Sequence, residues 1–359
     1  MKWGFAIAGF ALCSIALSSC AVPFYWQAAA GQLDLLRRRE PIAEVIADPQ
    51  TPAGLKQSLE DVERIRRFAI EELLLPDNGS YQTYADLDRD YVVWNVVAAE
   101  AFSVVPQQWC FPFAGCVAYR GFFDREKATQ YQARLAARGF DTWSGGSGAY
   151  STLGYFADPV LNTMIDSRAE EIAAVLVHEL AHQRVYVKGD SELSEAFAST
   201  VEEFGTRLWL QRTADTQGLA RYEERLRSRA VFARLIAVQQ ARLAEIYAQP
   251  LSEPEKLAAK SAAFAQLRSD YAIARDAGDI AARYDPWFAQ DLNNATLASV
   301  ATYRRWVPAL RMRLRERGLI DFYADVERLA ATDAQQRVAT LERWNAAAGA
   351  LAETGARRQ

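Results

Sequence analysis

Two histidines lie four residues apart in this chain of 359 residues, and the chain contains no others. His178 and His182 enclose Glu179 in the order His-Glu-x-x-His. Residues four apart share one face of an α-helix, so both imidazoles can reach a single metal ion while Glu179 reaches a water molecule beside it. The pattern predicts the zinc site of a hydrolase. The structural alternative is two helix-face histidines held in polar networks.

The third metal ligand must be a carboxylate. Catalytic zinc usually has three protein ligands, and no histidine is left to supply the third. The metzincin pattern also needs a further histidine, which residues 184–188 do not provide. The next predicted helix offers four carboxylates: Glu192, Glu195, Glu202 and Glu203.

We take Glu195 as the third ligand. The segment from Ser194 to Ala198 resembles the Asn-Glu-Gly-Phe-Ala segment that supplies the carboxylate ligand in gluzincin aminopeptidases. Glu202 remains the alternative, because its distance from His182 along the chain is closer to that in large members of the group. The two glutamates are seven residues apart on one helical face, so the one that does not bind metal can support the ligands.

These residue types indicate hydrolysis by an activated water molecule. Zinc would lower the pKa of its water toward about 7 and polarise the scissile carbonyl, while Glu179 would pass the water's proton to the leaving amine. The oxyanion also needs a donor, which must be a tyrosine, an arginine or a backbone N–H. The phenols to consider are Tyr150, Tyr155, Tyr186 and Tyr303, of which we favour Tyr186 and Tyr303 as catalytic.

A glycine-rich stretch precedes the metal helix. Glycine clusters beside a short apolar strand indicate a close approach of the backbone. Many zinc peptidases place an edge strand just before the metal helix, where the substrate pairs as an added strand. We therefore predict an edge strand at residues 149–154, with Tyr150, Leu153 and Gly154 in contact with the substrate. The alternative is a plain hairpin loop.

The remaining pattern predicts a mostly helical α+β fold. Apolar periodicity predicts helices at residues 33–47, 52–75, 127–138, 192–210, 218–248, 253–276, 292–306 and 321–347, and a capping box at 167–170 begins the metal helix. Runs of β-branched and aromatic residues predict strands at 91–99 and 117–123. We expect a small antiparallel or mixed sheet with an edge strand over the active-site helix, a long helical hairpin and C-terminal helices. The expected regions are a signal peptide at 1–19, an N-terminal anchor and helical arm at 20–89, a zincin-like catalytic core at 90–215 and a helical region at 216–359 that completes the cleft.

The first twenty residues have the pattern of an export signal. A lysine is followed by an apolar run that is short for a membrane span. The segment from Leu17 to Cys20 resembles the lipobox of bacterial lipoproteins, in which Cys20 becomes the lipidated N-terminus that anchors the protein to the membrane. Ala21 is not the aspartate linked to inner-membrane retention, so the outer membrane facing the periplasm is the expected location. The alternative is an ordinary secretory signal with an incidental cysteine.

Two cysteines remain beyond the anchor. Cys110 and Cys116 enclose five residues, and in an oxidising compartment such a pair indicates a local disulfide. Closing so small a loop stabilises the protein by only about 2 kcal/mol. The net charge is −4, so no basic excess points to nucleic acid as a partner.

Several segments together resemble a bacterial family of zinc aminopeptidase lipoproteins of about this length. They are residues 27–33, 152–159, 178–190, 194–198 and 292–303, and the block around His178 is the most specific. The resemblance implies a gluzincin-like metallopeptidase that binds one Zn²⁺ and acts on a peptide or protein. It also makes Asn294 a candidate for substrate binding. Ser194 stands where asparagine is expected, which affects any contact of that side chain with the substrate amine.

A second function from another class stays open. The chain could be a membrane-anchored binding or chaperone module, with a vestigial or structural zinc site and a long helical hairpin that does the binding. Structural zinc sites favour cysteine-rich closed shells, however, and Glu179 has little purpose beside a metal without hydrolysis. The sequence therefore favours the peptidase and leaves the oligomeric state open.

Overall fold

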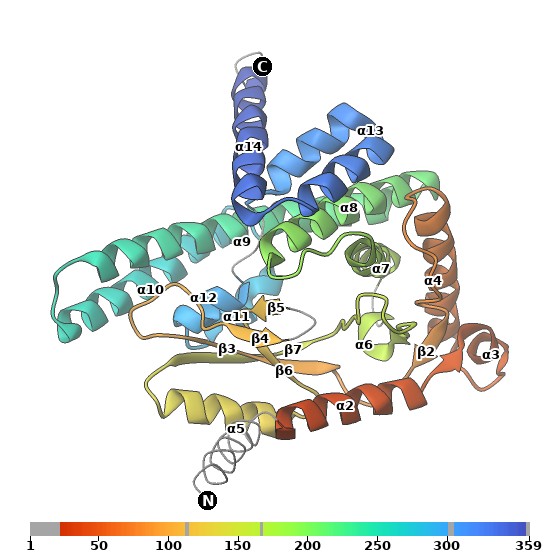
Figure 1. The fold of residues 1–359 in the computed structure, drawn as a ribbon, viewed down its shortest axis with the longest axis horizontal. Helices are drawn as coiled ribbons and strands as arrows, with labels where there is room; N and C mark the ends of the chain where they lie inside the picture. Colours follow the sequence, from red (N-terminus) through yellow and green to blue (C-terminus); the bar gives the residue numbers. More distant parts are fainter. Residues whose placement is uncertain (1–21, 112–114, 166–167, 301–304, 357–359) are drawn as a thin grey trace, which may run out of the picture.

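The computed structural model describes residues 22–111, 115–165, 168–300 and 305–356. A three-stranded antiparallel sheet lies at the centre, in the order β6 (Arg120–Phe122), β3 (Val93–Ala99) and β7 (Asp141–Ser147) (Figure 1). The sheet packs against α5 (Arg125–Ala136) through a small apolar cluster that includes Val96, Phe122 and Leu135. β7 pairs with β3 along its whole length and is an edge strand of this sheet.

Two smaller sheets flank the central one. β1 (Glu40–Pro41), β2 (Thr83–Ala85) and β8 (Val160–Leu161) form the first, in which β2 and β8 are parallel. β4 (Trp109–Phe111) and β5 (Gly115–Val117) form a hairpin whose register places Cys110 opposite Cys116. The two cysteines are joined by a disulfide, as the sequence predicts.

Helices make up most of the chain, which confirms the predicted α+β class. They are α2 (Val22–Arg37), α3 (Ile42–Ala47), α4 (Ala53–Glu71), α6 (Asn162–Ile165), α7 (Ala169–Arg184), α8 (Ser191–Arg212), α9 (Thr216–Ala248), α10 (Glu253–Asp276), the 3-10 turn η1 (Ala282–Tyr284), α11 (Asp285–Ala289), α12 (Asn294–Val300), α13 (Val307–Ala330) and α14 (Ala334–Ala356), besides α5. The capping box predicted at the start of the 253–276 helix is present at Ser252 and Glu255.

The helices α7 and α8 lie against each other and form the centre of the largest apolar cluster. A glycine allows this close approach, because a methyl group on Gly205 would lie 3.0 Å from Val177 Cγ1. The same cluster contains Leu35 from α2 and Leu341 from α14. It therefore draws on the arm, the core and the C-terminal region, whose division into domains stays a prediction.

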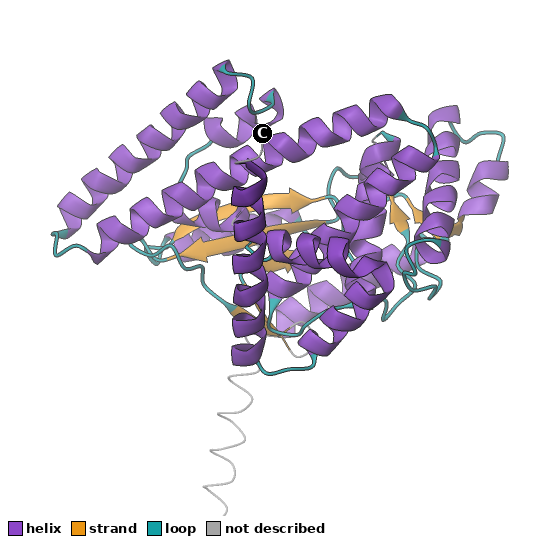
Figure 2. Cartoon of the chain, turned by 90° about the horizontal axis from the view of Figure 1, so that it is seen from above, coloured by secondary structure: helices purple, strands orange, loops and turns teal. Residues whose placement is uncertain are grey.

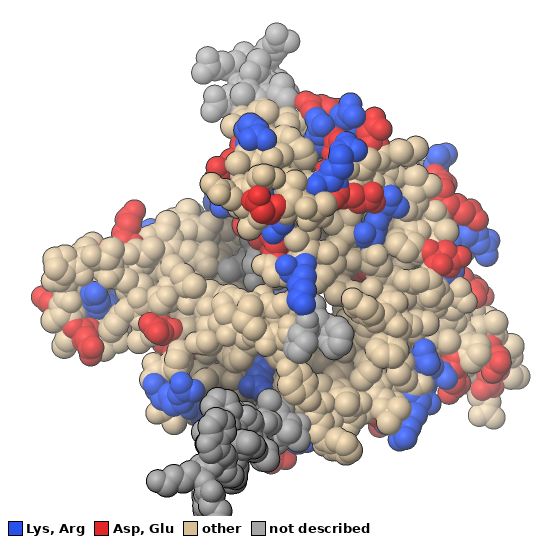
Figure 3. Space-filling model, in the orientation of Figure 1, with Lys and Arg blue, Asp and Glu red and all other residues tan. Residues whose placement is uncertain are grey.

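The hairpin of α9 and α10 projects from one side of the molecule (Figures 1 and 2). It has an apolar cluster of its own, which α11 and α12 help to form through Phe288 and Leu297. Acidic and basic side chains are interspersed over the face drawn in Figure 3, without a large region of one sign. Among the described residues, no helix combines the length and apolarity that a membrane span requires.

Two predicted helices and the predicted edge strand are wrong. Residues 33–47 do not form a single helix, because α2 ends at Arg37 and β1 separates it from α3. Residues 321–347 do not form a single helix, because α13 ends at Ala330 and Asp333 begins α14 by accepting a hydrogen bond from the backbone N–H of Gln336 (2.9 Å). Residues 149–154 are not a strand, since β7 ends at Ser147. The buried Asp158 carboxylate instead accepts hydrogen bonds from Ser151 and Thr152 and folds this segment into a turn.

Candidate active site

The two central helices are joined by a short turn that determines where the site residues lie. Two acidic residues, Glu170 and Glu171, occupy the first turn of α7. Their negative charges interact favourably with the positive end of the helix dipole. The predicted cap at Ser167 lies outside the described residues. Asp190 caps α8, because its side chain accepts a hydrogen bond from the backbone N–H of Leu193 (3.1 Å). The chain thus reverses direction at residues 185–190, and α8 packs against α7.

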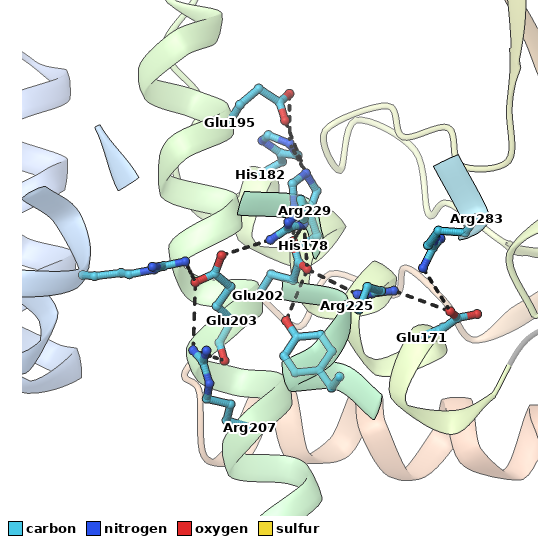
Figure 4. Close-up of polar contacts among 12 residues, drawn as sticks. Glu171, His178, His182, Glu195, Glu202, Glu203, Arg207, Arg225, Arg229 and Arg283 are labelled. Atoms are coloured by element: carbon cyan, nitrogen blue, oxygen red, sulfur yellow. Dashed lines mark hydrogen bonds and ion pairs between the residues drawn. The ribbon is translucent and has the colours of Figure 1, made fainter. Parts of the chain in front are cut away.

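This reversal brings three donor side chains together. One ligand atom each from His178, His182 and Glu195 lies within 4.8 Å of the others. The Nε2 atoms of the histidines are 3.1 Å apart, and each is 3.4 Å from an oxygen of the Glu195 carboxylate (Figure 4). The Glu195 side chain keeps 41% of its surface exposed, so the cluster is open to solvent on that side.

Glu202 lies on the opposite side of the His178 ring. Its carboxylate is 3.3 Å from His178 Nδ1 and accepts hydrogen bonds from the Tyr222 hydroxyl and from Arg229, both at 3.3 Å. Glu202 is 4% exposed and is held away from the three donor atoms. The structure therefore brings Glu195 to the Nε2 atoms of both histidines and places Glu202 on the Nδ1 side of His178, where it holds the ring.

The two glutamates raise the pKa of His178. Burial alone would lower the pKa of His178, but the contacts with Glu195 and Glu202 outweigh it and raise the pKa to about 10. Burial alone would likewise raise the pKa of Glu202, but His178 and Arg229 lower it to about 2. His182 Nδ1 is buried and has no hydrogen-bond partner among the described residues.

Glu179 lies beside the cluster. Burial raises the pKa of its carboxyl, the two histidines lower it, and the negative charge of Glu195 raises it again, with a net increase. Glu179 and His178 line a hollow of about 270 Å³. A larger hollow of about 910 Å³ is lined by residues that include Asp86 and Asp88, so volume alone does not identify the site.

The family model described as "Putative aminopeptidase" matches residues 23–341. The chain belongs to this family. No curated protein and no solved structure gave a match. The matched residues include α7, α8 and α9, so the whole cluster lies within the part that defines membership of the aminopeptidase family. Membership supports a hydrolase of the peptidase type.

One of the predicted phenols, Tyr186, lies near the site of this aminopeptidase family member. The Tyr186 ring centroid is 6.4 Å from that of His182, and burial, followed by the charge of Glu195, raises the pKa of Tyr186. Tyr150 packs edge-on against Phe123 at 5.3 Å, and burial with the charge of Asp158 raises its pKa to about 12. Tyr155 is 75% exposed. Tyr303, like Cys20, lies outside the described residues.

Two of the predicted substrate contacts, Leu153 and Gly154, lie in a turn and not in a strand. Leu153 and Gly154 have φ angles of 57° and 79°, which suit a turn and exclude the predicted pairing as an edge strand. A methyl group on Gly154 would lie 3.6 Å from Gln183, so this turn approaches the end of α7.

Asn294 is not brought to the cluster. The residue is 1% exposed, its side-chain amide donates to the carbonyls of Glu100 and Ala101, and its oxygen accepts from the Tyr247 hydroxyl at 2.8 Å. These bonds fix α12 against the turn after β3. The predicted contact of Asn294 with substrate is therefore wrong, because its side chain is buried and bonded to other residues of the protein.

Sequence reasoning missed three arginines and one aspartate at the site of this aminopeptidase family member. Arg225, Arg229 and Arg283 line the same hollow as Glu179. Asp158 orders the turn that carries Leu153. No local pattern marks the arginines, since the chain holds many charged residues on helical faces. The Asp158-Pro159 pair does mark a break in structure, and this signal could have located the turn.

Proposed function

We propose that this protein is a zinc-dependent peptidase in which His178, His182 and Glu195 hold the metal and Glu179 is the general base. The observation that carries the proposal is the meeting of three donor atoms within 4.8 Å beside Glu179. Two imidazoles and a carboxylate form a ligand set that suits zinc. Membership of the aminopeptidase family supports the same reaction class.

Zinc in this site would supply a Lewis acid that polarises the scissile carbonyl and makes water more acidic. The protein's own residues would handle the proton. The Glu179 carboxylate would accept a proton from the attacking water and deliver it to the nitrogen of the leaving amine. Its raised pKa makes the carboxylate a stronger base toward the attacking water. Glu202 would hold His178 so that Nε2 faces the cluster.

The preference for the amino end of a peptide rests on family membership. An aminopeptidase needs an anionic group for the substrate amine, and Glu192, Glu202 and Glu203 are the candidates from sequence. Glu202 and Glu203 are at most 4% exposed, and both pair with Arg229. Glu192 is partly exposed and hydrogen-bonded to Trp306, and among these three it is the candidate that we retain for the amine.

The proposed location follows from the N-terminal sequence. A lipid on Cys20 would anchor the enzyme to the membrane. The outer membrane, on its periplasmic side, is the proposed location because Ala21 is not the aspartate linked to inner-membrane retention. The substrate would then be a peptide or protein of the cell envelope. Labelling with a radioactive fatty acid tests the anchor, since Cys20→Ala should abolish the label.

The decisive test measures zinc content and peptide cleavage in the same samples of full-length protein. Wild type should carry about one zinc and release amino acids from unblocked peptides. Glu179→Gln should retain the zinc and lose about 10²- to 10⁴-fold in kcat, because only the proton transfer is removed. Glu195→Ala should lose the metal.

The exposed Glu224, on α9, gives a matched control, since Glu224→Gln should keep both zinc and activity. Equal cleavage by wild type and Glu179→Gln would contradict the proposal. Absence of both metal and cleavage in wild type would favour the binding or chaperone module.

A further inference from the structure

The lining of the hollow beside Glu179 contains more arginines than carboxylates. Its lining includes three guanidinium groups, from Arg225 and Arg229 on α9 and from Arg283 on η1. Two carboxylates face them, those of Glu179 and Glu202. A metal ion held by the adjacent ligands would add further positive charge at the same place.

The three arginines differ in how fully they are paired. Arg229 lies 3.3 Å from Glu202 and 3.0 Å from Glu203, so it balances buried carboxylates. Arg225 has only longer ion pairs, at 3.6 Å to Glu202 and 3.9 Å to Glu171. Arg283 lies 3.9 Å from the same Glu171 oxygen. The two arginines thus share a single glutamate oxygen at a distance beyond a hydrogen bond (Figure 4).

This arrangement suits an incoming carboxylate. A guanidinium group presents paired N–H donors whose geometry matches a carboxylate. Arg225 keeps 19% and Arg283 keeps 53% of its side chain exposed, so both can be reached from solvent. The hollow of about 270 Å³ is small, and it shares His178 and Glu179 with the reacting centre. A group bound there must lie close to the scissile bond.

We propose that Arg225 and Arg283 bind a carboxylate of the peptide substrate and thereby select substrates that carry this group near the bond to be cut. The proposal rests on the proposed function, and it names the substrate class. The carboxylate can be the C-terminus of a short peptide or the side chain of an acidic residue. Both sources present the same group to the two guanidinium groups.

The test compares matched peptides on full-length zinc-loaded enzyme. The first pair is Leu-Ala with a free carboxylate and Leu-Ala amide, which tests the C-terminus. The second pair is Leu-Glu amide and Leu-Gln amide, which tests an acidic side chain. Wild type should prefer the charged member of at least one pair by about tenfold or more in kcat/KM, the range for hydrogen bonds to charged groups.

Substitution should reduce this preference. Arg225→Gln and Arg283→Gln should each lower the ratio for the preferred pair several-fold, whereas Arg234→Gln, an exposed residue on the same helix, should keep the wild-type ratio. If Arg225→Gln fails to fold, Arg283→Gln carries the test because its side chain is more than half exposed.

Two results would overturn the proposal while the peptidase stands. One is equal cleavage of both members in both pairs, and the other is a preference that neither variant changes. If wild type cleaves no peptide, the proposed function fails, and calorimetric binding of the four peptides to wild type decides the present proposal. Tighter binding of a charged member that weakens in Arg283→Gln would support it, and equal binding of charged and uncharged members would overturn it.

Discussion

Glu195 and Glu202 stand seven residues apart on α8 and contact opposite nitrogens of the same imidazole. Glu195 faces Nε2 of both histidines, while Glu202 faces only Nδ1 of His178. A carboxylate on Nδ1 keeps the proton on that nitrogen and leaves Nε2 available for a metal. The two residues should therefore affect metal binding to different degrees.

Replacing Glu202 by glutamine should weaken zinc binding without abolishing it. The expected loss in affinity is about 10- to 100-fold, the usual effect of removing a group that orients a ligand. Competition with a chelator of known affinity measures it, at a temperature where the variant is folded. Glu195→Ala should lose far more. If Glu202→Gln loses zinc as completely as Glu195→Ala, the assignment of the third ligand is wrong.

At the scale of single residues, the sequence predicts the contacts between side chains that lie close together along the chain. His178, Glu179, His182 and Glu195 lie within eighteen residues of one another, so helical geometry and one turn determine their meeting. Arg283 is about a hundred residues from His178, and its approach depends on how α9 and η1 fold back. A local sequence pattern cannot predict a contact between residues so far apart along the chain.

Among the elements, α7 depends on an ion pair at its first turn. Glu170 is 3% exposed, and Arg221 on α9 donates two hydrogen bonds to its carboxylate, at 2.5 and 3.0 Å. Burial alone would raise the pKa of Glu170, but the bonds from Arg221 outweigh it and hold the pKa below the ordinary value. The pair thus connects α7, which carries both histidines, to α9, which supplies Arg225.

A folded-state pKa below the unfolded value means that ionised Glu170 stabilises the protein above the ordinary pKa of about 4.5. This contribution is lost as the pH falls through the lowered pKa. Glu170→Gln should cost about 1 kcal/mol at neutral pH, a modest figure because Arg221 is partly exposed. Urea unfolding of both proteins from pH 7 to pH 3 should show the difference shrinking on the acid side. A difference that is constant over this range would contradict the assignment.

The edge strand predicted at residues 149–154 lies earlier in the chain, as β7. The glycine cluster predicts a close approach of the backbone, but Gly145 and Gly146 belong to β7 and leave room for aromatic rings. A methyl group on Gly146 would lie 2.1 Å from the ring of Tyr91, and one on Gly145 would lie 2.1 Å from that of Trp143. A sequence without alternating apolar residues does not reveal such a strand, because ring packing replaces the usual pattern.

At the scale of the whole molecule, the site helices belong to the main apolar cluster. That cluster extends from α2 to α14, so a ligand that joins α7 to α8 should stabilise the entire fold. Glu203 adds a second connection, since it is 1% exposed and pairs with Arg229 on α9 and Arg311 on α13.

Removal of the metal should therefore lower the melting temperature. Zinc at about 100 times its dissociation constant adds about 2.7 kcal/mol to the stability of a protein that binds it only when folded. Chelation followed by calorimetry should lower the melting temperature of wild type by a few degrees, and added zinc should restore it. Glu195→Ala should show no such response, and an equal response in both proteins would indicate that the ion binds elsewhere.

The disulfide hairpin lies directly on the turn that joins α7 and α8. Gly115 in β5 has a φ of 78°, and a methyl group on it would lie 2.8 Å from the backbone nitrogen of Gly189. The turn at 185–190 determines how far His182 lies from Glu195. We therefore expect an order of maturation in which oxidation of Cys110 and Cys116 precedes tight metal binding.

Such an order would keep the proposed zinc peptidase inactive in a reducing compartment until its disulfide has formed. Zinc affinity measured with and without a reductant, and in a variant with serine at both cysteine positions, tests this idea. Equal affinity in all three samples would rule it out. A weaker affinity in the reduced and serine forms would mean that a newly made chain cannot digest the contents of the compartment in which it is synthesised.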